Sequence, residues 1–491
     1  MEVVFGGPGT GKTTYLIERV SQCLEAGVLP QRIAYMAFTR KAAQEAKRRT
    51  CEELGLQAKQ LPYFSTLHSM AYRELGLHQG CVMGGEEYQE LSDMLGVHLT
   101  APKIITEGPP ILGNDRSALV QVLNYARTTA RPLEEVWREC GSRVNWWELV
   151  QLAKALYNYK QDRGKMDFTD MLEEYELVGQ ALPVDVGIID EAQDLTRLQW
   201  DVAWRALSGA TDIIAAGDDD QAIYRWSGAD VTQFQELARK PDTEVKVLGH
   251  SHRLPRKVFA LAQSVARRIS VRQPKDWEPA DREGEVRWVA YPQALDLTAG
   301  EWLLLARNAY HLQEYERTCR LQGVSFVNAA GPSVKGTHVH AIKCWESLRQ
   351  GRAVYGSDLK HLTTVYPPLR HHGFEPQEAQ WTRSDLGLPE DMEIWHDALV
   401  GIPIEQREYY LAILRRGEKL TTKPRVRVAT IHSVKGGEAD NVVLRTDMTS
   451  RSFEALRRFP DDEHRVYYVG ATRARKSLFL VAPQSPRAYQ F

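Results

Sequence analysis

The sequence predicts an α/β fold with more than one domain. Short apolar runs typical of buried parallel strands recur, each followed by turn residues and a helical stretch. They are EVVF, IAYMAF, VGIID and DIIAA in the first half, and EVRWVA, WLLLA, VRVATI, NVVL and LFLV in the second. At 491 residues the chain exceeds the length that one hydrophobic core supports, roughly 250 to 300 residues. We therefore expect two α/β cores built on parallel sheets.

Two segments that differ in residue composition and spacing interrupt these cores. Residues 69–166 are rich in Leu, Ala, Trp and Glu at helical spacing, and residues 331–423 combine loop-like stretches with the helix-like run IEQREYYLAILRRG. We expect both to be mainly helical insertions. The predicted domains are a first core of residues 1–68 and 167–249, its insertion 69–166, a second core of residues 250–330 and 424–491, and its short insertion 331–423.

Composition limits the classes of function. Lys and Arg total 62 against 64 Asp and Glu, so a nucleic-acid site would have to be a local patch. The six cysteines are scattered without the pairing typical of zinc sites or disulfide frameworks, which favours a reducing compartment. Because the first residues lack a signal pattern and no apolar run is long enough to cross a bilayer, we expect a cytoplasmic protein that uses no membrane.

A phosphate-binding loop is predicted near the start of the chain. VVFGGPGTGKTTYLIERV reads as strand, glycine-rich loop and helix, and contains the pattern GxxxxGK[ST]. Glycines let backbone N–H groups converge on phosphate oxygens, the helix N-terminus adds positive charge, and the lysine reaches the outer phosphates. The alternative is a glycine turn before an ordinary helix. The expected nucleotide-binding residues are Gly6, Gly7, Pro8, Gly9, Thr10, Gly11, Lys12, Thr13 and Thr14, with Thr13 also a magnesium ligand.

An acidic pair after a second strand complements this loop. In VGIIDEAQD, Asp190 and Glu191 follow an apolar run. We expect Asp190 to hold Mg²⁺ through water and Glu191 to act as the general base that polarises the attacking water. Alone, two adjacent carboxylates after a strand are as easily a solvated loop; beside the phosphate loop they favour a nucleotide triphosphatase.

The order of further motifs indicates a family. Besides the loop and DEAQD, the chain carries AFTRKAAQEAKRR, FSTLHSMAYREL, DFTDML, GDDDQAIYRWSGAD, SHR, ARN, ATIHSVKGGEAD and YYVGATRAR. In this order the chain resembles superfamily 1A helicases of the UvrD/Rep/PcrA type over nearly its whole length. The resemblance implies that the two cores are RecA-like motor domains, and that the insertions are those this family carries.

The same resemblance assigns the catalytic roles that remain. It implies that Gln221 touches the γ-phosphate of ATP, and that Arg253 and Arg473 reach it across the cleft between the motor domains. Glu438 is expected to bond the ribose, and His252 to stack on the base. For the arginine-rich run around Arg473, the alternative is a solvated surface.

A set of expected single-stranded DNA contacts also follows from the resemblance. Stacking of aromatic rings on bases suits a motor, because every base has a π-face, while contacts to phosphates are independent of base identity. Each of these residues has an ordinary structural alternative, such as a core aromatic, a helix cap or a packed histidine. The expected contacts are Phe38, Thr39, Thr66, His68, Tyr224, Trp226 and His432.

Three departures from the family pattern bear on nucleotide selectivity. The family carries a glutamine-containing segment before the phosphate loop that reads adenine, whereas here Gly6 follows Met1 almost at once. Thr14 replaces an arginine, and His252 replaces a tyrosine. We expect ATP to be preferred, with weaker discrimination against other nucleoside triphosphates.

The sequence therefore predicts an ATP- and Mg²⁺-dependent translocase on single-stranded DNA that unwinds duplex in the 3′-to-5′ direction. The expected partners are single-stranded and 3′-tailed duplex DNA, bound by a monomer, with a separate loading protein allowed. A different class stays open: a nucleotide-gated binding module that displaces bound proteins without processive unwinding. An RNA motor is less favoured, since DDDQAIYRW is closer to the DNA-directed branch.

Overall fold

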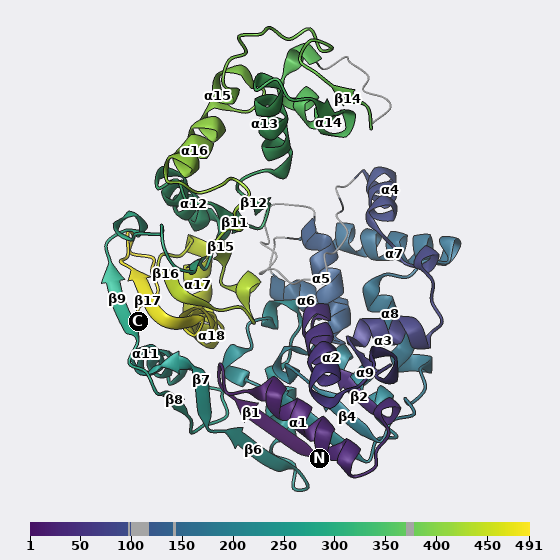
Figure 1. Cartoon of the computed structure of the whole chain (residues 1–491). Coiled ribbons are helices and arrows are strands. Elements are labelled where there is room, and N and C mark those ends of the chain that lie inside the picture. The colour runs from purple at the N-terminus through teal and green to yellow at the C-terminus, as the bar shows by residue number, and fades with distance from the viewer. Residues whose placement is uncertain (97–98, 100–116, 141–143, 370–377) are drawn as a thin grey trace.

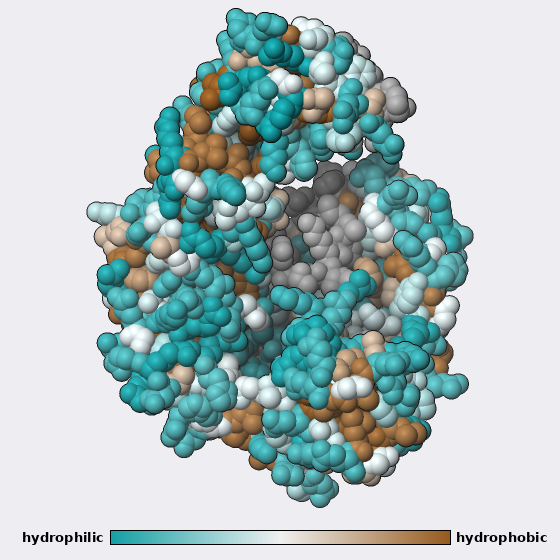
Figure 2. All heavy atoms as spheres, viewed as in Figure 1, coloured by the Kyte–Doolittle hydropathy of each residue, from teal (hydrophilic) through white to brown (hydrophobic). Residues whose placement is uncertain are grey.

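Two parallel sheets form the base of the molecule, and a helical lobe rises from each (Figure 1). The computed structural model describes residues 1–491 except 97–98, 100–116, 141–143 and 370–377. The N-terminal sheet lies at the lower right of Figure 1 and the second sheet at the left, while α13 to α16 form the uppermost lobe. Figure 2 shows a largely hydrophilic face, hollowed between this upper lobe and the lobe of α4 and α7.

The first sheet is parallel, with strand order β3-β2-β4-β5-β1-β6. Alternate residues of its strands face opposite layers of helices, as strand geometry requires. Val4 packs with α1 and α2, whereas Val3 and Phe5 pack with α3, α8 and α9. The strands are β1 (Glu2–Gly6), β2 (Ile33–Met36), β3 (Phe64–Ser65), β4 (Val186–Ile189), β5 (Asp212–Gly217) and β6 (Glu244–Leu248). The helices are α1 (Lys12–Glu25), α2 (Arg40–Leu54), α3 (Leu67–Glu74), α8 (Phe168–Val178), α9 (Arg197–Ala206) and α10 (Val231–Leu237).

The second sheet has the order β12-β11-β15-β10-β16-β17-β9, parallel except for the β11–β12 pair. Leu303 and Leu305 pack against α11 and α18, and Leu304 packs on the other face with α12. The strands are β9 (Glu285–Val289), β10 (Trp302–Ala306), β11 (Phe326–Asn328), β12 (Gly331–Pro332), β15 (Val426–Thr430), β16 (Ala439–Arg445) and β17 (Ala474–Val481). The helices are α11 (Arg256–Ala266), α12 (Leu312–Leu321), α17 (Ser450–Arg458) and α18 (Pro460–Ala471).

Helices dominate both interrupting segments. The first segment holds α4 (Gly85–Leu95), α5 (Ser117–Thr128), α6 (Leu133–Cys140) and α7 (Trp146–Arg163), which share a separate apolar core. The second holds α13 (Gly336–Arg349), α14 (Gly356–Val365), α15 (Trp395–Ala398), α16 (Ile404–Arg415) and the short pair β13 (Val354–Tyr355) and β14 (Gln380–Trp381). Its core is continuous with one face of the second sheet.

The predicted fold class, α/β with two parallel-sheet domains of RecA-like type and mainly helical insertions, is confirmed. The domain boundaries stay predictions. Strand β12 begins at Gly331, the first residue that we assign to the second insertion. The described cysteines, Cys23, Cys51, Cys81, Cys319 and Cys344, are free thiols. Within the described ranges, no helix combines the length and apolar character that a bilayer crossing requires.

One further strand pair connects the two halves. β7 (His250–Pro255) and β8 (Glu278–Ala280) pair in parallel, apart from both large sheets. β7 follows β6 directly, and its first residues contact the loop after β1. This pair therefore carries the chain from the first sheet to the second across the edge at which the candidate site lies.

Candidate nucleotide and DNA site

The predicted site residues of the first half gather at one edge of the first sheet. Because its strands are parallel, their carboxyl ends meet there, which is where open α/β sheets bind ligands. The phosphate loop follows β1, Phe38 follows β2, Thr66 follows β3, Asp190 follows β4 and the aspartate turn follows β5. The topology thus brings together residues from Gly6 to Asp220, which lie far apart in the chain.

The loop between β1 and α1 has the backbone of an anion site. Gly9 and Gly11 adopt positive φ angles of 75° and 80°, which favour glycine. Helix α1 begins at Lys12, and no side chain caps its first turn. The N–H groups of that turn are therefore available to phosphate oxygens, and the helix dipole favours negative charge there.

The polar side chains of the loop turn back onto the loop itself. Lys12 Nζ donates to the Gly6 carbonyl oxygen (2.9 Å), and Thr10 Oγ1 donates to the Gly7 carbonyl oxygen (2.9 Å). Thr13 is half-buried beside them, whereas Thr14 is exposed and its hydroxyl accepts from Arg49. Lys12, the first residue of α1, can exchange its backbone acceptor for a phosphate oxygen, and the Thr13 hydroxyl beside it could bind a metal, so the two residues fit a magnesium triphosphate.

The acidic pair lies at the end of β4, with Asp190 buried and Glu191 half-buried. Tyr35 donates its hydroxyl to Asp190 Oδ2 (2.7 Å). Burial, together with the neighbouring Glu191 carboxylate, raises the pKa of Asp190 to about 6. Burial alone would also raise the pKa of Glu191, but the cations Lys435 and Lys12 outweigh it and lower that pKa. The two carboxyls thus differ in proton affinity, and Glu191 is the one held ionised.

Glu191 also has an unusual backbone. Its φ of 53° places a non-glycine residue in the left-handed region, a conformation shared among the described residues only with Ala130. Such a conformation costs about 1–2 kcal/mol and persists where the surroundings fix it. Glu191 N–H donates to Asp190 Oδ1 (2.9 Å), and the Gln193 side-chain amide donates to Glu191 Oε2 (2.5 Å). The strained backbone is therefore held by contacts with its immediate neighbours.

Gln221 joins the two halves of the site. Its amide Nε2 donates to Asp218 Oδ2 (2.7 Å), and its amide Oε1 accepts from Arg473 Nη2 (2.7 Å). Lys435 from the second half donates to the Gln221 carbonyl oxygen (2.7 Å) and forms an ion pair with Asp194. One glutamine thus receives two cations from the opposite sheet.

Arg473 is buried with neutral partners. It is 1% exposed, and besides Gln221 it donates to the carbonyl oxygens of Val469 and Gly437 and to the Thr472 hydroxyl. Burial lowers the pKa of its guanidinium, and the nearby positive charge of Arg253 lowers it further. An anion between these arginines would offset the cost of burying their charge.

Strand β7 holds Arg253 against the phosphate loop. Ser251 Oγ donates to the Pro8 carbonyl oxygen (2.7 Å), and the His252 N–H donates to the Gly9 carbonyl oxygen (2.9 Å). A Cβ atom at Gly9 would lie 2.2 Å from Arg253 Cβ, so the close approach requires glycine. Arg253 forms an ion pair with Glu438, which also lies 3.5 Å from Arg475. The side chain of His252 is exposed and contacts His250.

The aromatic residues lie next to Gln221. The rings of Phe38 and Tyr224 are stacked with centroids 5.5 Å apart, and Trp226 meets Tyr224 edge-on at 6.2 Å. Tyr224 is 5% exposed, and its hydroxyl donates to the His432 carbonyl oxygen (3.3 Å). Phe38 and Trp226 are only half-buried. In this arrangement Tyr224 would have to leave its position to stack on a base, whereas Phe38 and Trp226 are partly accessible.

Three of the four remaining predicted DNA contacts, Thr39, Thr66 and His68, have structural partners. Thr39 Oγ1 caps α2 by accepting from the Ala42 N–H, and Thr66 Oγ1 caps α3 by accepting from the Ser69 N–H. His68 meets Phe168 edge-on, and burial lowers its pKa to about 4. His432 is buried, and among the described residues its Nδ1 has no hydrogen-bond partner. Thr39, Thr66 and His68 therefore contribute to local structure, whereas the part of the chain that the structure describes gives the His432 ring no such contact.

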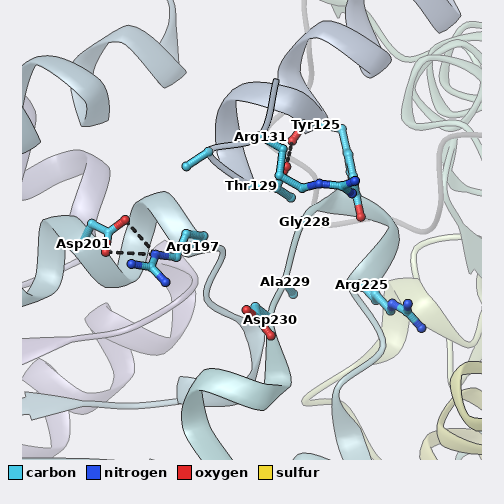
Figure 3. A pocket seen from close by; sticks show the side chains of 10 residues that line it. Tyr125, Thr129, Arg131, Arg197, Asp201, Arg225, Gly228, Ala229 and Asp230 are labelled. Carbon is cyan, nitrogen blue, oxygen red and sulfur yellow. Dashed lines mark hydrogen bonds and ion pairs between the residues drawn. The ribbon is translucent and has the colours of Figure 1, made fainter. Parts of the chain in front are cut away.

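A cavity of about 460 Å³ opens beside this aromatic group, between α5 and α9 (Figure 3). Arg131, Arg197 and Arg225 line it, and their carboxylate partners are Glu139, Asp201 and Asp462. Figure 3 shows Tyr125 and Thr129 on one side and Ala229 and Asp230 below them. The cavity leads from the first insertion to the turn that carries Trp226.

The sequence did not single out Lys275. The turn Asp218–Asp220 is buried, and its three carboxylates could hold a metal ion. Instead the Lys275 ammonium lies 3.0 Å from Asp218 Oδ1 and 2.8 Å from Asp220 Oδ2, and it also contacts Asp219. Lys275 lies 56 residues from Asp219 and outside the motifs, so no local pattern indicates it.

Comparison with known proteins agrees with this geometry. The UvrD/REP helicase N-terminal domain matches residues 2–242, and the UvrD-like helicase C-terminal domain matches residues 411–485. The ATP-dependent DNA helicase PcrA of Bacillus subtilis is 27% identical over 57% of this chain, and the putative ATP-dependent DNA helicase YjcD of the same organism is 24% identical over 59%. The ATP-dependent DNA helicase UvrD2 of Mycobacterium tuberculosis is 26% identical over 97%.

The matched regions cover 39% of PcrA, 39% of YjcD and 76% of UvrD2, so this chain spans about two fifths of the first two relatives. Together the two matching domains cover more than half of this chain and include the phosphate loop, the acidic pair, Gln221 and Arg473. The chain therefore belongs to the UvrD/REP helicase family.

Proposed function

We propose that the protein is an ATP-dependent translocase on single-stranded DNA and a DNA helicase with 3′-to-5′ polarity. One observation carries the proposal: two cations from the second half, Arg473 and Lys435, both bind Gln221. Gln221 lies only three residues before Tyr224 in the sequence. A change at the phosphates would thereby be transmitted to the aromatic group and to the contact between the two sheets.

The chain's own groups have distinct proposed roles in ATP hydrolysis. Lys12, Thr13 and the loop N–H groups would hold the triphosphate, and Asp190 would hold Mg²⁺ through water. Bound Mg²⁺ supplies neutralisation of the phosphate charge. Glu191, kept ionised by the neighbouring lysines, would accept a proton from the attacking water. Arg253 and Arg473 would bring positive charge to the terminal phosphate.

Recognition of the nucleoside is proposed to be loose. His252 is exposed and would stack on any base, while Glu438 would bond the ribose only by releasing one of its arginine partners. We therefore expect a modest ATP preference. Steady-state hydrolysis of ATP, GTP and CTP tests this, and a preference of about a hundredfold or more for ATP would contradict it.

DNA is proposed to bind through Phe38 and Trp226, with phosphate contacts near Thr39, Thr66, His68 and His432. Stacking on partly accessible rings is tolerant of sequence and contributes about 1–3 kcal/mol per base. Tyr224 packs against both rings and would support them, and it would reach a base only after a rearrangement. Binding should weaken steeply with salt.

Unwinding of 3′-tailed, 5′-tailed and blunt duplexes tests the proposed function. We expect ATP-dependent strand separation on the 3′-tailed substrate alone, by a monomer. The Lys12→Ala variant should be inactive on all three substrates. Separation of the 5′-tailed duplex alone would contradict the polarity, and displacement of bound proteins without any strand separation would contradict the helicase activity.

A further inference from the structure

Residues 271–277, here called the strap, cross from the end of α11 back to the first sheet. Arg272 donates two hydrogen bonds to the Asp220 carboxylate (2.8 and 2.6 Å), and the Gln273 N–H donates to Asp219 Oδ2 (2.5 Å). At its end, Trp277 is 4% exposed and packs on Gly7 of the phosphate loop, where an added Cβ would lie 2.7 Å from the indole ring. The strap thus touches both the aspartate turn and the phosphate loop.

Lys275 lies at the centre of the strap with its side chain fully enclosed. Three adjacent buried carboxylates repel one another and would be strongly destabilising without a compensating charge. The three ion pairs from Lys275 supply that charge. Burial alone would lower the pKa of Lys275, but the three carboxylates outweigh it and raise that pKa, so the lysine stays protonated.

The Asp218 carboxylate connects Lys275 to the proposed catalytic residues Gln221 and Arg473. Asp218 Oδ1 faces Lys275 (3.0 Å), and Asp218 Oδ2 accepts from Gln221 Nε2 (2.7 Å). An ionised carboxylate only accepts hydrogen bonds, so it selects the NH₂ end of the Gln221 amide. The other end, Oε1, then faces Arg473 and accepts its hydrogen bond (2.7 Å). A protonated Asp218 could donate instead and turn the amide around.

We propose that Lys275 is a positioning residue for hydrolysis: by holding Asp218 as an acceptor, it sets the orientation of the Gln221 amide and thereby places Arg473. The proposal rests on the proposed function, in which Gln221 and Arg473 act at the terminal phosphate. Arg272 belongs to the same strap and pairs with the same turn, but its carboxylate partner is Asp220, whereas the Gln221 amide bonds Asp218. It therefore provides a matched control.

The test is DNA-stimulated ATP hydrolysis by the full chain. Lys275→Met should lower kcat about 10- to 100-fold with KM for ATP changed by less than about threefold, since Lys275 pairs with the aspartate turn and Trp277, which packs on the phosphate loop, is retained. Arg272→Gln, which also removes one buried cation, should lower thermal stability comparably yet keep kcat within about threefold. Equal kcat losses in the two variants would overturn the proposal.

A double-substitution cycle separates positioning from a general structural effect. On a Gln221→Ala background, Lys275→Met should lower kcat by no more than about twofold, because the group through which it acts is gone. A full additive loss would contradict the proposal.

Asp218→Asn provides a variant that keeps Lys275 and the shape of the turn. An amide at this position can donate to Gln221 Oε1, so we expect a loss of kcat similar to that of Lys275→Met, and a crystal structure of the variant without the Arg473–Gln221 hydrogen bond. Retention of that bond would overturn the inference without reference to activity. Absence of DNA-stimulated ATP hydrolysis in the unsubstituted chain would instead contradict the proposed function.

Discussion

Trp226 is the residue on which the proposed grip on DNA depends most. It is half-buried, it meets Tyr224 edge-on, and its indole N–H has no hydrogen-bond partner in the structure. Trp226→Ala should weaken single-stranded DNA binding about 5- to 150-fold, because one stacked base contributes about 1–3 kcal/mol. Basal ATP hydrolysis should stay within about twofold, since the phosphate loop is not altered.

Fluorescence anisotropy with labelled oligothymidylate checks this, beside hydrolysis without DNA. Trp288→Ala is the matched control, because Trp288 lies on β9 and is 50% exposed. Equal DNA affinity in the Trp226 and Trp288 variants would show that Trp226 does not grip the strand.

His68 gives stability a pH dependence of known sign. Burial lowers its pKa from about 6.5 to about 4, so the folded chain excludes a proton that the unfolded chain binds. The stability contributed by the neutral ring is complete above about pH 6.5 and is lost as pH falls toward 4. Between pH 7.5 and 5.5, His68→Gln should lose less stability than the unsubstituted chain, by about 1 kcal/mol.

Urea unfolding at the two pH values measures this difference. If the variant loses as much stability as the unsubstituted chain, the proton taken up on unfolding belongs to another residue. His432 is an example, because burial also lowers its pKa.

The sequence predicted some of these residues and missed others for physical reasons. Asp190 follows an apolar strand directly and Lys12 follows the glycine-rich loop after another strand, so local pattern and spacing locate them. Thr39 and Thr66 stand where a helix cap is expected, and capping is what their hydroxyls do, whatever further contact they make. Lys275 was not predicted because its partners lie far away in the chain. The strap also has no strand or helix periodicity, and only folding brings it to the aspartate turn.

Ion pairs that centre on the buried residues Lys160 and Asp167 connect α5 and α7 to α8. Arg127 contacts the carboxylates of Asp167 (2.8 Å), Asp170 (2.5 Å) and Glu173 (2.5 Å), and Lys160 contacts Asp167 and Asp170. This network joins the first helical insertion to the first sheet's helices. The motif DFTDML, found as part of the family resemblance, supplies two of the carboxylates and caps α8.

Arg127→Met should destabilise the chain by about 3 kcal/mol, because it leaves the buried Asp167 and the half-buried Asp170 and Glu173 with too few cations. Arg138→Met, which breaks an exposed pair with Glu134 on α6, should change stability by less than about 0.5 kcal/mol. Thermal and urea unfolding of both variants measure the difference. Similar stabilities would mean that the apolar core of the insertion, rather than this network, holds the lobe in place.

Single strands are easier to predict from the sequence than the contacts between distant segments. Most strands of both sheets are predicted from apolar runs, since parallel strands covered on both faces contain few polar residues. The exceptions are β3, β6, β11 and β12, which are short or lie at a sheet edge. By contrast, the burial of Tyr224 depends on Phe38 from another strand end and on His432 from the other sheet. No window of the sequence around Tyr224 contains either partner. Pairing of β7 with β8 likewise depends on the close approach of β7 to the phosphate loop.

For the whole molecule, the central claim is that the two sheets share one nucleotide site, so that events at the phosphates alter the hold on a single strand. Lys435, Arg473 and β7 all cross from one half to the other at this place. The strap adds a fourth crossing at the aspartate turn. An effect of DNA on ATP turnover is the direct consequence, because the strand and the phosphates would bind parts of one connected network.

The most direct test is therefore the steady-state rate of ATP hydrolysis by the full chain, measured as single-stranded oligothymidylate is titrated in. We expect a saturable rise in kcat of about tenfold or more, abolished in the Arg473→Ala variant. A rate that the oligonucleotide leaves unchanged at saturating ATP, in a chain shown to bind that oligonucleotide, would contradict it.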